Sequence, residues 1–312
     1  MERQNFVDEL GGLMILSVIL GHAIGFAGLT VNNRLNPIIF FMFWFYFKSG
    51  MYYRPKEREQ MLIGGAKKLL LPFAVYSLVG YIVDCFAMYV YGEIGWKHYI
   101  LTPLKDLLLR GSISGNLPLW FLFSLYCVQV IFNELYIRSF RPICLFGGGV
   151  LISSVSYYIS LKYPYYLSTV SLGLAAYSFG YIFQELQYTK KSFCIFLALY
   201  LGIFLFCPSF IDFRDNCLND GGNYFLAVAF SLSGCIIFDN IFQKLPNCTV
   251  LQFIGRNSME YYVTHWIVLN ICYVLCSKFF HCHGISSYCL MVFFSILIPT
   301  IFIQIKSKIM KY

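Results

Sequence analysis

Charged residues are scarce in this chain. Only 12% of its 312 residues are Asp, Glu, Lys or Arg, while 59% are hydrophobic and 20% are aromatic. Soluble domains carry about 25% charged residues, so too few polar side chains are present to cover a water-facing surface. This shortage excludes a soluble globular protein and indicates that lipid is the solvent.

Motifs for metal or nucleic-acid binding are also missing. The chain has 12 cysteines but no Cys-x-x-Cys pair, and its net charge of +8 is spread over short loops without a basic patch interleaved with aromatics. His281, Cys282 and His283 form a dense group of soft ligands, but three adjacent loop residues do not converge on one ion. We therefore expect neither a metal site nor a nucleic-acid partner.

Long apolar runs bounded by charges, Pro and Gly fill the sequence. At about 20 residues per spanning helix, they predict an all-α polytopic membrane protein of ten helices, with residues 1–312 forming a single integral-membrane domain. The predicted spans are 10–29, 36–53, 69–91, 117–137, 143–161, 165–184, 192–210, 223–242, 259–277 and 286–306.

Basic residues gather in alternate loops. The densest run, from Arg54 to Lys68, lies between the second and third spans, and three lysines, Lys306, Lys308 and Lys311, lie at or after the end of the last span. Because basic loops remain in the cytoplasm, we expect both termini there, in a multi-pass protein of a cell membrane of the bacterial inner-membrane type. Acidic residues precede the first span, so it is interpreted as a mature helix and not as a signal peptide.

Two histidines fall inside predicted spans, where ionisable groups are costly and therefore candidates for function. His22 lies roughly 18 Å into the first span, and a neutral imidazole there accepts and returns a proton near physiological pH. A structural hydrogen bond between helices is the alternative. His265 lies only roughly 9 Å into the ninth span, so we expect it not to pair with His22 but to line an entrance or support the structure.

Other polar and aromatic residues in the spans have simpler expected roles. Asp84 is the deepest predicted carboxylate, while Lys48 and Glu134 lie near helix ends, where long side chains extend to the interface. The aromatic run at 40–47, FFMFWFYF, is expected to face lipid or form an interfacial belt.

Five different short motifs follow one another along the chain in a defined order. They are Asp8 followed by GGLMILSVILGH, ending at His22; FFMFWFYFKSGMYY, with Ser49 and Gly50; AKKLLLPF, with Lys67, Lys68 and Pro72; NLPLWFLFSLY, with Trp120, Phe121 and Leu122; and FIGRNSMEYYVTHW, with Gly255, Asn257, Ser258 and His265. Over about residues 5 to 270, this series resembles the integral membrane family called acyltransferase 3, and within it the branch of sugar O-acetylases such as fucose 4-O-acetylase.

The resemblance implies transfer of an acetyl group from cytoplasmic acetyl-CoA to a sugar hydroxyl of a cell-surface polysaccharide or lipid-linked glycan. His22 would act as general base or transient acyl carrier, with Asp84 orienting its imidazole. Acetyl-CoA, the glycan acceptor and membrane lipids would be the partners. The expected substrate-binding residues are Ser49, Lys67, Lys68, Trp120, Arg256, Asn257, Ser258 and His265.

One position departs from the family pattern. Many relatives carry Arg or Lys on the first helix about three turns before the histidine, and here Gly11 and Gly12 stand there. Lys67, Lys68 or Arg256 would then bind the coenzyme A phosphates. An inactive acyltransferase-like partner protein and a multi-pass transporter or flippase of a glycan or small solute are the alternatives.

Overall fold

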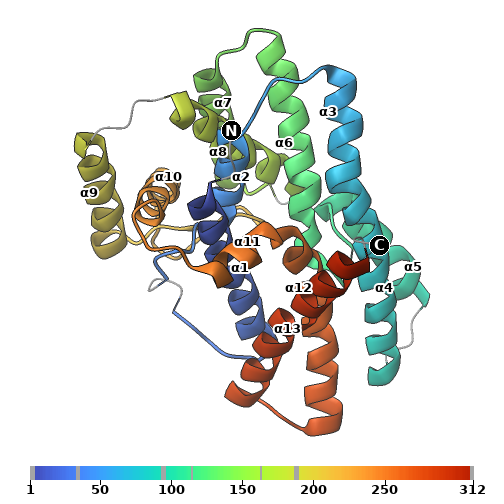
Figure 1. Cartoon of the computed structure of the whole chain (residues 1–312). Helices are drawn as coiled ribbons and strands as arrows, with labels where there is room; N and C mark the ends of the chain where they lie inside the picture. Colours follow the sequence, from blue (N-terminus) through green and yellow to red (C-terminus); the bar gives the residue numbers. More distant parts are fainter. Residues whose placement is uncertain are drawn as a thin grey trace.

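The structure is a bundle of helices with one small β-hairpin. This computed structural model describes residues 4–32, 36–92, 96–113, 115–161, 164–185 and 190–309 (Figure 1). The helices are α1 (Asn5–Phe26), α2 (Phe41–Met51), α3 (Arg58–Gly65), η2 (Ala66–Leu70), α4 (Leu71–Tyr91), α5 (Trp96–Arg110), η3 (Leu117–Leu119), α6 (Trp120–Ile137), α7 (Pro142–Tyr158), α8 (Tyr165–Glu185), α9 (Lys190–Phe206), α10 (Tyr224–Phe242), α11 (Thr249–Arg256), α12 (Ser258–Val274), η4 (Leu275–Phe280) and α13 (Ile285–Ile309).

Six helical segments of the described chain are long and apolar enough to cross a membrane. They are α1, the continuous α3–η2–α4 helix, η3–α6, α10, α12–η4 and α13. The all-α architecture is therefore confirmed, and each of the ten predicted spans falls on a helix, but α2, α7, α8 and α9 do not meet the same criteria of length and hydropathy. The number of ten spans stays a prediction.

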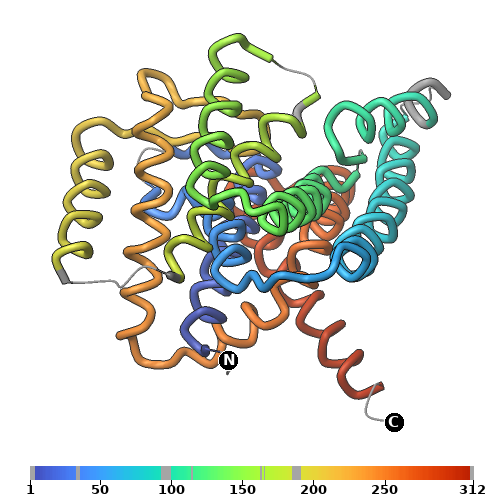
Figure 2. Tube along the Cα trace, turned by 90° about the horizontal axis from the view of Figure 1, so that it is seen from above, coloured from blue at the N-terminus to red at the C-terminus, as the bar shows by residue number. Residues whose placement is uncertain are grey.

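The outer surface of α4 shows how the bundle meets lipid. Leu78, Ile82, Phe86 and Tyr89 recur every three or four residues and are all exposed, so they form one apolar stripe along the helix. Helix α4 lies at one edge of the molecule and α9 at the opposite edge (Figure 2). In a protein without enough charge to cover its surface, this stripe faces the hydrocarbon.

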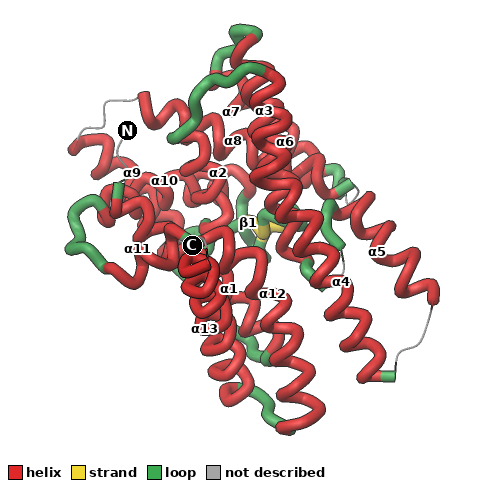
Figure 3. The backbone as a smooth tube through the Cα atoms, turned by 45° about the vertical axis from the view of Figure 1, so that its right-hand side comes forward, coloured by secondary structure: helices red, strands yellow, loops and turns green. Residues whose placement is uncertain are grey.

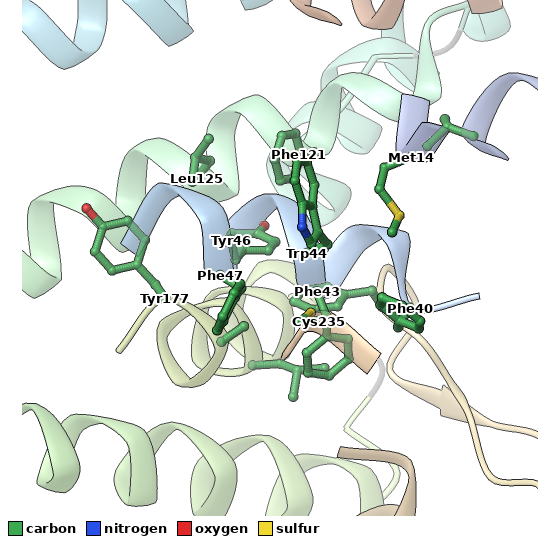
Figure 4. Close-up of a cluster of buried hydrophobic side chains, with 14 of the residues drawn as sticks. Met14, Phe40, Phe43, Trp44, Tyr46, Phe47, Phe121, Leu125, Tyr177 and Cys235 are labelled. Atoms are coloured by element: carbon green, nitrogen blue, oxygen red, sulfur yellow. The ribbon is translucent and has the colours of Figure 1, made fainter. Parts of the chain in front are cut away.

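Helix α2 occupies the centre of the bundle, which corrects the prediction for its aromatic run. Phe40, Phe43, Trp44, Tyr46 and Phe47 are each at most 2% exposed (Figure 4). They pack against α6, α8 and α10 instead of lipid. Aromatic edges and faces fill the space between these helices, so this run builds the core.

Close backbone contacts hold α2 against α8. A Cβ on Gly50 would lie 1.9 Å from the Tyr177 carbonyl oxygen, and one on Gly180 would lie 2.0 Å from the Phe47 carbonyl oxygen. Neither position accepts a larger residue unless the helices separate. The Ser-Gly motif of the second span therefore has a packing role at its glycine.

The short helix α11 packs in the same way on the first half of α1 (Figure 3). A Cβ on Gly255 would lie 1.7 Å from the Asp8 carbonyl oxygen, and one on Gly12 would lie 2.2 Å from the Leu251 carbonyl oxygen. The buried Asp8 carboxylate pairs with Arg256, at 3.1 Å between Oδ2 and Nε. These contacts fix where α12 begins relative to α1.

A two-stranded hairpin reaches from the loop after α9 back into the bundle. Its antiparallel strands are β1 (Ile211–Asp212) and β2 (Cys217–Leu218). Phe213, in the turn, is 3% exposed and stacks on Tyr46 and on Trp120, with ring centroids 5.0 and 6.1 Å apart. The hairpin is thus anchored in the aromatic core.

Candidate active site

His22 on α1 and His265 on α12 lie face to face. Their ring centroids are 5.4 Å apart with an interplanar angle of 19°, and the edge of Trp266 packs on His22 with centroids 5.0 Å apart. The prediction that the two histidines lie at different depths and do not pair is therefore wrong.

The position along α1 at which α12 begins explains this pairing. The predicted depths assume that both spans begin at one membrane surface, but α11 places Gly255 beside Asp8 and Gly12, already inside α1. His265 is the eighth residue of α12, which begins at Ser258 shortly after α11 ends at Arg256, and His22 comes ten residues after Gly12 on α1. The two imidazoles consequently reach the same level.

Hydrogen bonds define the protonation of His265. This fully buried side chain places Nδ1 2.6 Å from the Tyr262 carbonyl oxygen and 3.2 Å from that of Tyr261. A carbonyl only accepts, so we assign the hydrogen to Nδ1, and Nε2 keeps its lone pair. Nε2 has no hydrogen-bond partner among the described residues, which makes it an acceptor beside the His22 ring.

His22 lines a cavity of about 730 Å³, within the range that holds small-molecule ligands. The walls come from the second half of α1, the segment leading into α2, the beginning of α6, the hairpin, and Tyr262 of α12. Trp120, which the sequence predicts to bind substrate, also lines the cavity, and that role stays a prediction. His265 stands behind His22 and is not part of the wall.

The hairpin gives this cavity its charged groups. Asp212, Arg214 and Asp215 all line it, and the Arg214 side chain is 26% exposed. Loss of water around the carboxyl and the neighbouring charge of Asp215 raise the pKa of Asp212. The sequence pattern did not identify these residues as part of the site. They reach the cavity because Phe213 is buried in the aromatic core and holds the hairpin over the cavity that His22 lines.

A second group of polar residues lies near the start of α1. A Cβ on Gly11 would lie 3.3 Å from the Lys48 Nζ, which is also 4.9 Å from the Trp44 ring centroid. The sequence predicts that Lys48 extends toward the interface, but its ammonium group lies against α1. Also at the start of α1, Arg256 binds Asp8 and donates from Nη2 to the Asn5 side-chain oxygen at 2.9 Å.

Asp84 is not brought to His22. It lies on α4, where its Cβ is 2.8 Å from the position that a Cβ on Gly115 would take, and α12 runs between α1 and α4 (Figure 1). It does not line the cavity. The orienting role predicted for Asp84 therefore has no support in the geometry, and α12 itself orients the histidine pair.

The other predicted binding residues lie outside the cavity. Lys67 and Lys68 are exposed on η2, the π-helical turn that precedes α4. Ser49 is half-buried next to Gly50. Asn257 and Ser258 lie at the bend between α11 and α12, where the Asn257 amide donates to the Phe253 carbonyl oxygen at 2.8 Å.

The fold and this site define a class of protein: a multi-pass membrane protein with a histidine on the wall of a cavity between its helices. The family model described as "Acyltransferase domain" matches residues 5–303, so the chain belongs to this family of membrane acyltransferases. Comparison with curated proteins and with solved structures found no match.

Proposed function

We propose that this protein transfers an acetyl group from acetyl-CoA to a hydroxyl of a sugar, in a cell-surface polysaccharide or a lipid-linked glycan. The observation that carries this proposal is the stacked pair of His22 and His265, with His22 on the wall of a cavity large enough for a sugar. The family supplies acyl transfer, and the branch of sugar O-acetylases is the one that the motifs resemble.

In the proposed reaction His22 takes the proton of the acceptor hydroxyl as its oxygen attacks the thioester carbonyl carbon. The tetrahedral intermediate then collapses, the carbon–sulfur bond breaks, and the coenzyme A thiolate takes the proton from His22. Atoms balance as acetyl-CoA plus alcohol giving ester plus coenzyme A. His22 as a transient acyl carrier is the alternative, with the same stoichiometry.

Lys48 supports a donor site at the other end of α1. Gly11 has no side chain, and the Lys48 ammonium lies beside it, where many relatives place a basic residue on the first helix. Gly11 and His22 are eleven residues apart, about 16 Å along the helix. A donor whose phosphates bind near Lys48 would extend its pantetheine arm toward His22.

This arrangement fits a protein of a cell membrane, of the bacterial inner-membrane type, with both termini in the cytoplasm. Acetyl-CoA is too highly charged to cross lipid and is made in the cytoplasm, so the Lys48 end would face inward. The cavity would then open to the outside, where the glycan acceptor approaches.

The test is O-acetylation of surface glycans in cells that carry the wild type, His22→Ala or no copy. We expect acetyl groups only with the wild type, at equal membrane abundance of both proteins. His283→Ala is the matched control, since His283 is exposed in the loop before α13.

Two outcomes would contradict the proposal. Full acetylation by His22→Ala would remove His22 from the chemistry. No change in acetylation of any surface glycan, even with the wild type, would favour the transporter or the inactive partner.

A further inference from the structure

The hairpin presents one arginine to the cavity from a firmly held position. Phe213, directly before Arg214, is buried between Tyr46 and Trp120. Two residues after Arg214, the Asn216 amide donates to the Ser153 carbonyl oxygen at 3.0 Å. Arg214 therefore stands between two buried anchors.

Asp212 fixes the backbone at the same point. Its Oδ1 accepts the backbone N–H of Arg214 at 3.0 Å and that of Asp215 at 3.4 Å. A carboxylate that accepts two successive N–H groups closes a tight turn. The backbone of Arg214 is thus set by the hairpin itself, which reduces the entropy lost when its side chain binds a ligand.

The guanidinium group keeps donors available. Asp215 approaches Nε at 3.9 Å between nitrogen and oxygen, which is beyond hydrogen-bond distance. Among the described residues no ion pair involves the two terminal nitrogens, Nη1 and Nη2. These groups remain able to donate to an anion inside the cavity.

A cation lines the same cavity as the proposed general base. Arg214 is the only Lys or Arg among the described residues that line the cavity, and His22 and Tyr262 line the same cavity. Asp212 and Asp215 line the same cavity and balance part of its positive charge, and protonation of His22 adds one more positive charge there. An anion formed in the same step would be stabilised by the guanidinium group and by the protonated imidazole.

The tetrahedral intermediate of acyl transfer is such an anion. Attack by the hydroxyl oxygen moves the carbonyl π electrons onto the carbonyl oxygen, while the hydroxyl proton moves to His22. One negative and one positive charge thus form together. When the intermediate collapses, the electron pair returns to the carbonyl and the thiolate leaves.

We propose that Arg214 is a catalytic residue that donates hydrogen bonds from its guanidinium group to this oxyanion. The inference rests on the proposed function, since it concerns the same acyl transfer. It assigns the hairpin a part in the chemistry itself. A residue that only bound the acceptor glycan would not contact the reacting carbonyl oxygen.

The experiment compares two reactions of the purified protein in lipid vesicles: transfer of acetyl from acetyl-CoA to the glycan fraction, and the slower transfer to water. Released coenzyme A is measured by mass spectrometry, because a thiol reagent would also react with the 12 cysteines. The variants are Arg214→Gln and Arg214→Lys. Arg138→Gln, at an exposed arginine paired with Glu134, is the control.

We expect Arg214→Gln to lower kcat about 100-fold or more in both reactions, the usual loss for one oxyanion donor, with the KM for acetyl-CoA unchanged. Arg214→Lys, which keeps the charge, should recover part of the rate, and Arg138→Gln should behave as wild type. Loss of transfer with normal hydrolysis would overturn the proposal and make Arg214 an acceptor-binding residue.

Unchanged kcat in Arg214→Gln would also overturn it. These results differ from a failure of the proposed function, in which the wild type itself releases no coenzyme A in either reaction.

Discussion

At the scale of the residue, the environment of His22 decides what its imidazole can do. One face stacks on His265, whose Nδ1 hydrogen is held by the Tyr262 carbonyl, and the edge of Trp266 restricts its rotation. The ring also lines the cavity. A histidine fixed by its neighbours and open to a ligand has the geometry that proton transfer requires.

Lys48 is the second residue whose neighbours give it a testable role. We expect Lys48→Gln to raise the KM for acetyl-CoA about tenfold, because a desolvated ion pair or charged hydrogen bond with phosphate contributes on the order of 1.5 kcal/mol. Steady-state kinetics in vesicles measure this. Lys244→Gln is the matched control, since Lys244 also lies over an aromatic ring, 5.5 Å from that of Phe193.

The exposed lysines of η2 provide the competing assignment. If Lys67 and Lys68 bind the phosphates, changing both to Gln will raise this KM while Lys48→Gln leaves it at the wild-type value. That pattern would place the donor on the surface of the α3–η2–α4 helix.

At the scale of the element, α11 sets the register between α1 and α12. Gly255 allows the backbones of α11 and α1 to touch near Asp8, and the ion pair between Arg256 and Asp8 stabilises this contact. The level of His265 follows from this contact. Packing of an eight-residue helix that crosses no membrane thus positions half of the histidine pair.

A larger residue at Gly255 should therefore disturb both stability and activity. A Cβ there would lie 1.7 Å from the Asp8 carbonyl oxygen, so Gly255→Ala must move the backbone, at a cost of about 1–3 kcal/mol. We expect a lower thermal midpoint in detergent and a loss of acetyl transfer. Gly147→Ala on α7, where a Cβ meets nothing within 4 Å, should change neither; equal midpoints for both variants would contradict this account of α11.

At the scale of the whole molecule, the two groups of polar residues lie toward opposite ends of α1. Lys48 and Arg256 lie near its start, and the cavity with His22 and the hairpin lies along its second half. A transferase that takes its donor from one side of the membrane and its acceptor from the other needs this separation. This separation serves the proposed reaction only if the Lys48 end of α1 faces the cytoplasm and the cavity opens to the outside.

Cysteine labelling tests that orientation. Cys217 is exposed on the hairpin, and Lys67 is exposed on η2. We expect a membrane-impermeant maleimide to label Cys217 in intact cells, and to label Lys67→Cys only after the membrane is opened, each in a variant without other cysteines. The reverse pattern would invert the topology and exclude a cytoplasmic donor at Lys48.

The sequence by itself determined what composition and local pattern control. Scarce charge indicated lipid as the solvent, and apolar runs located the helices. His22 was identified because it is an ionisable residue inside a predicted span, and Trp120 because it belongs to a motif that resembles the family. The resemblance to the acyltransferase family was confirmed over residues 5–303, and the branch of sugar O-acetylases stays a prediction. These features depend on hydrophobicity and on residues close to one another in sequence.

Only the tertiary structure decided which of these residues meet. It paired His22 with His265, turned the aromatic run of α2 inward, left Asp84 on the far side of α12, and brought Arg214 and Lys48 to α1. The histidine pair depends on the backbone contact between Gly255 and Asp8, the position of α2 on that between Gly50 and Tyr177, and the place of Arg214 on the buried Phe213. Such contacts join segments far apart in the chain, and no local periodicity records them.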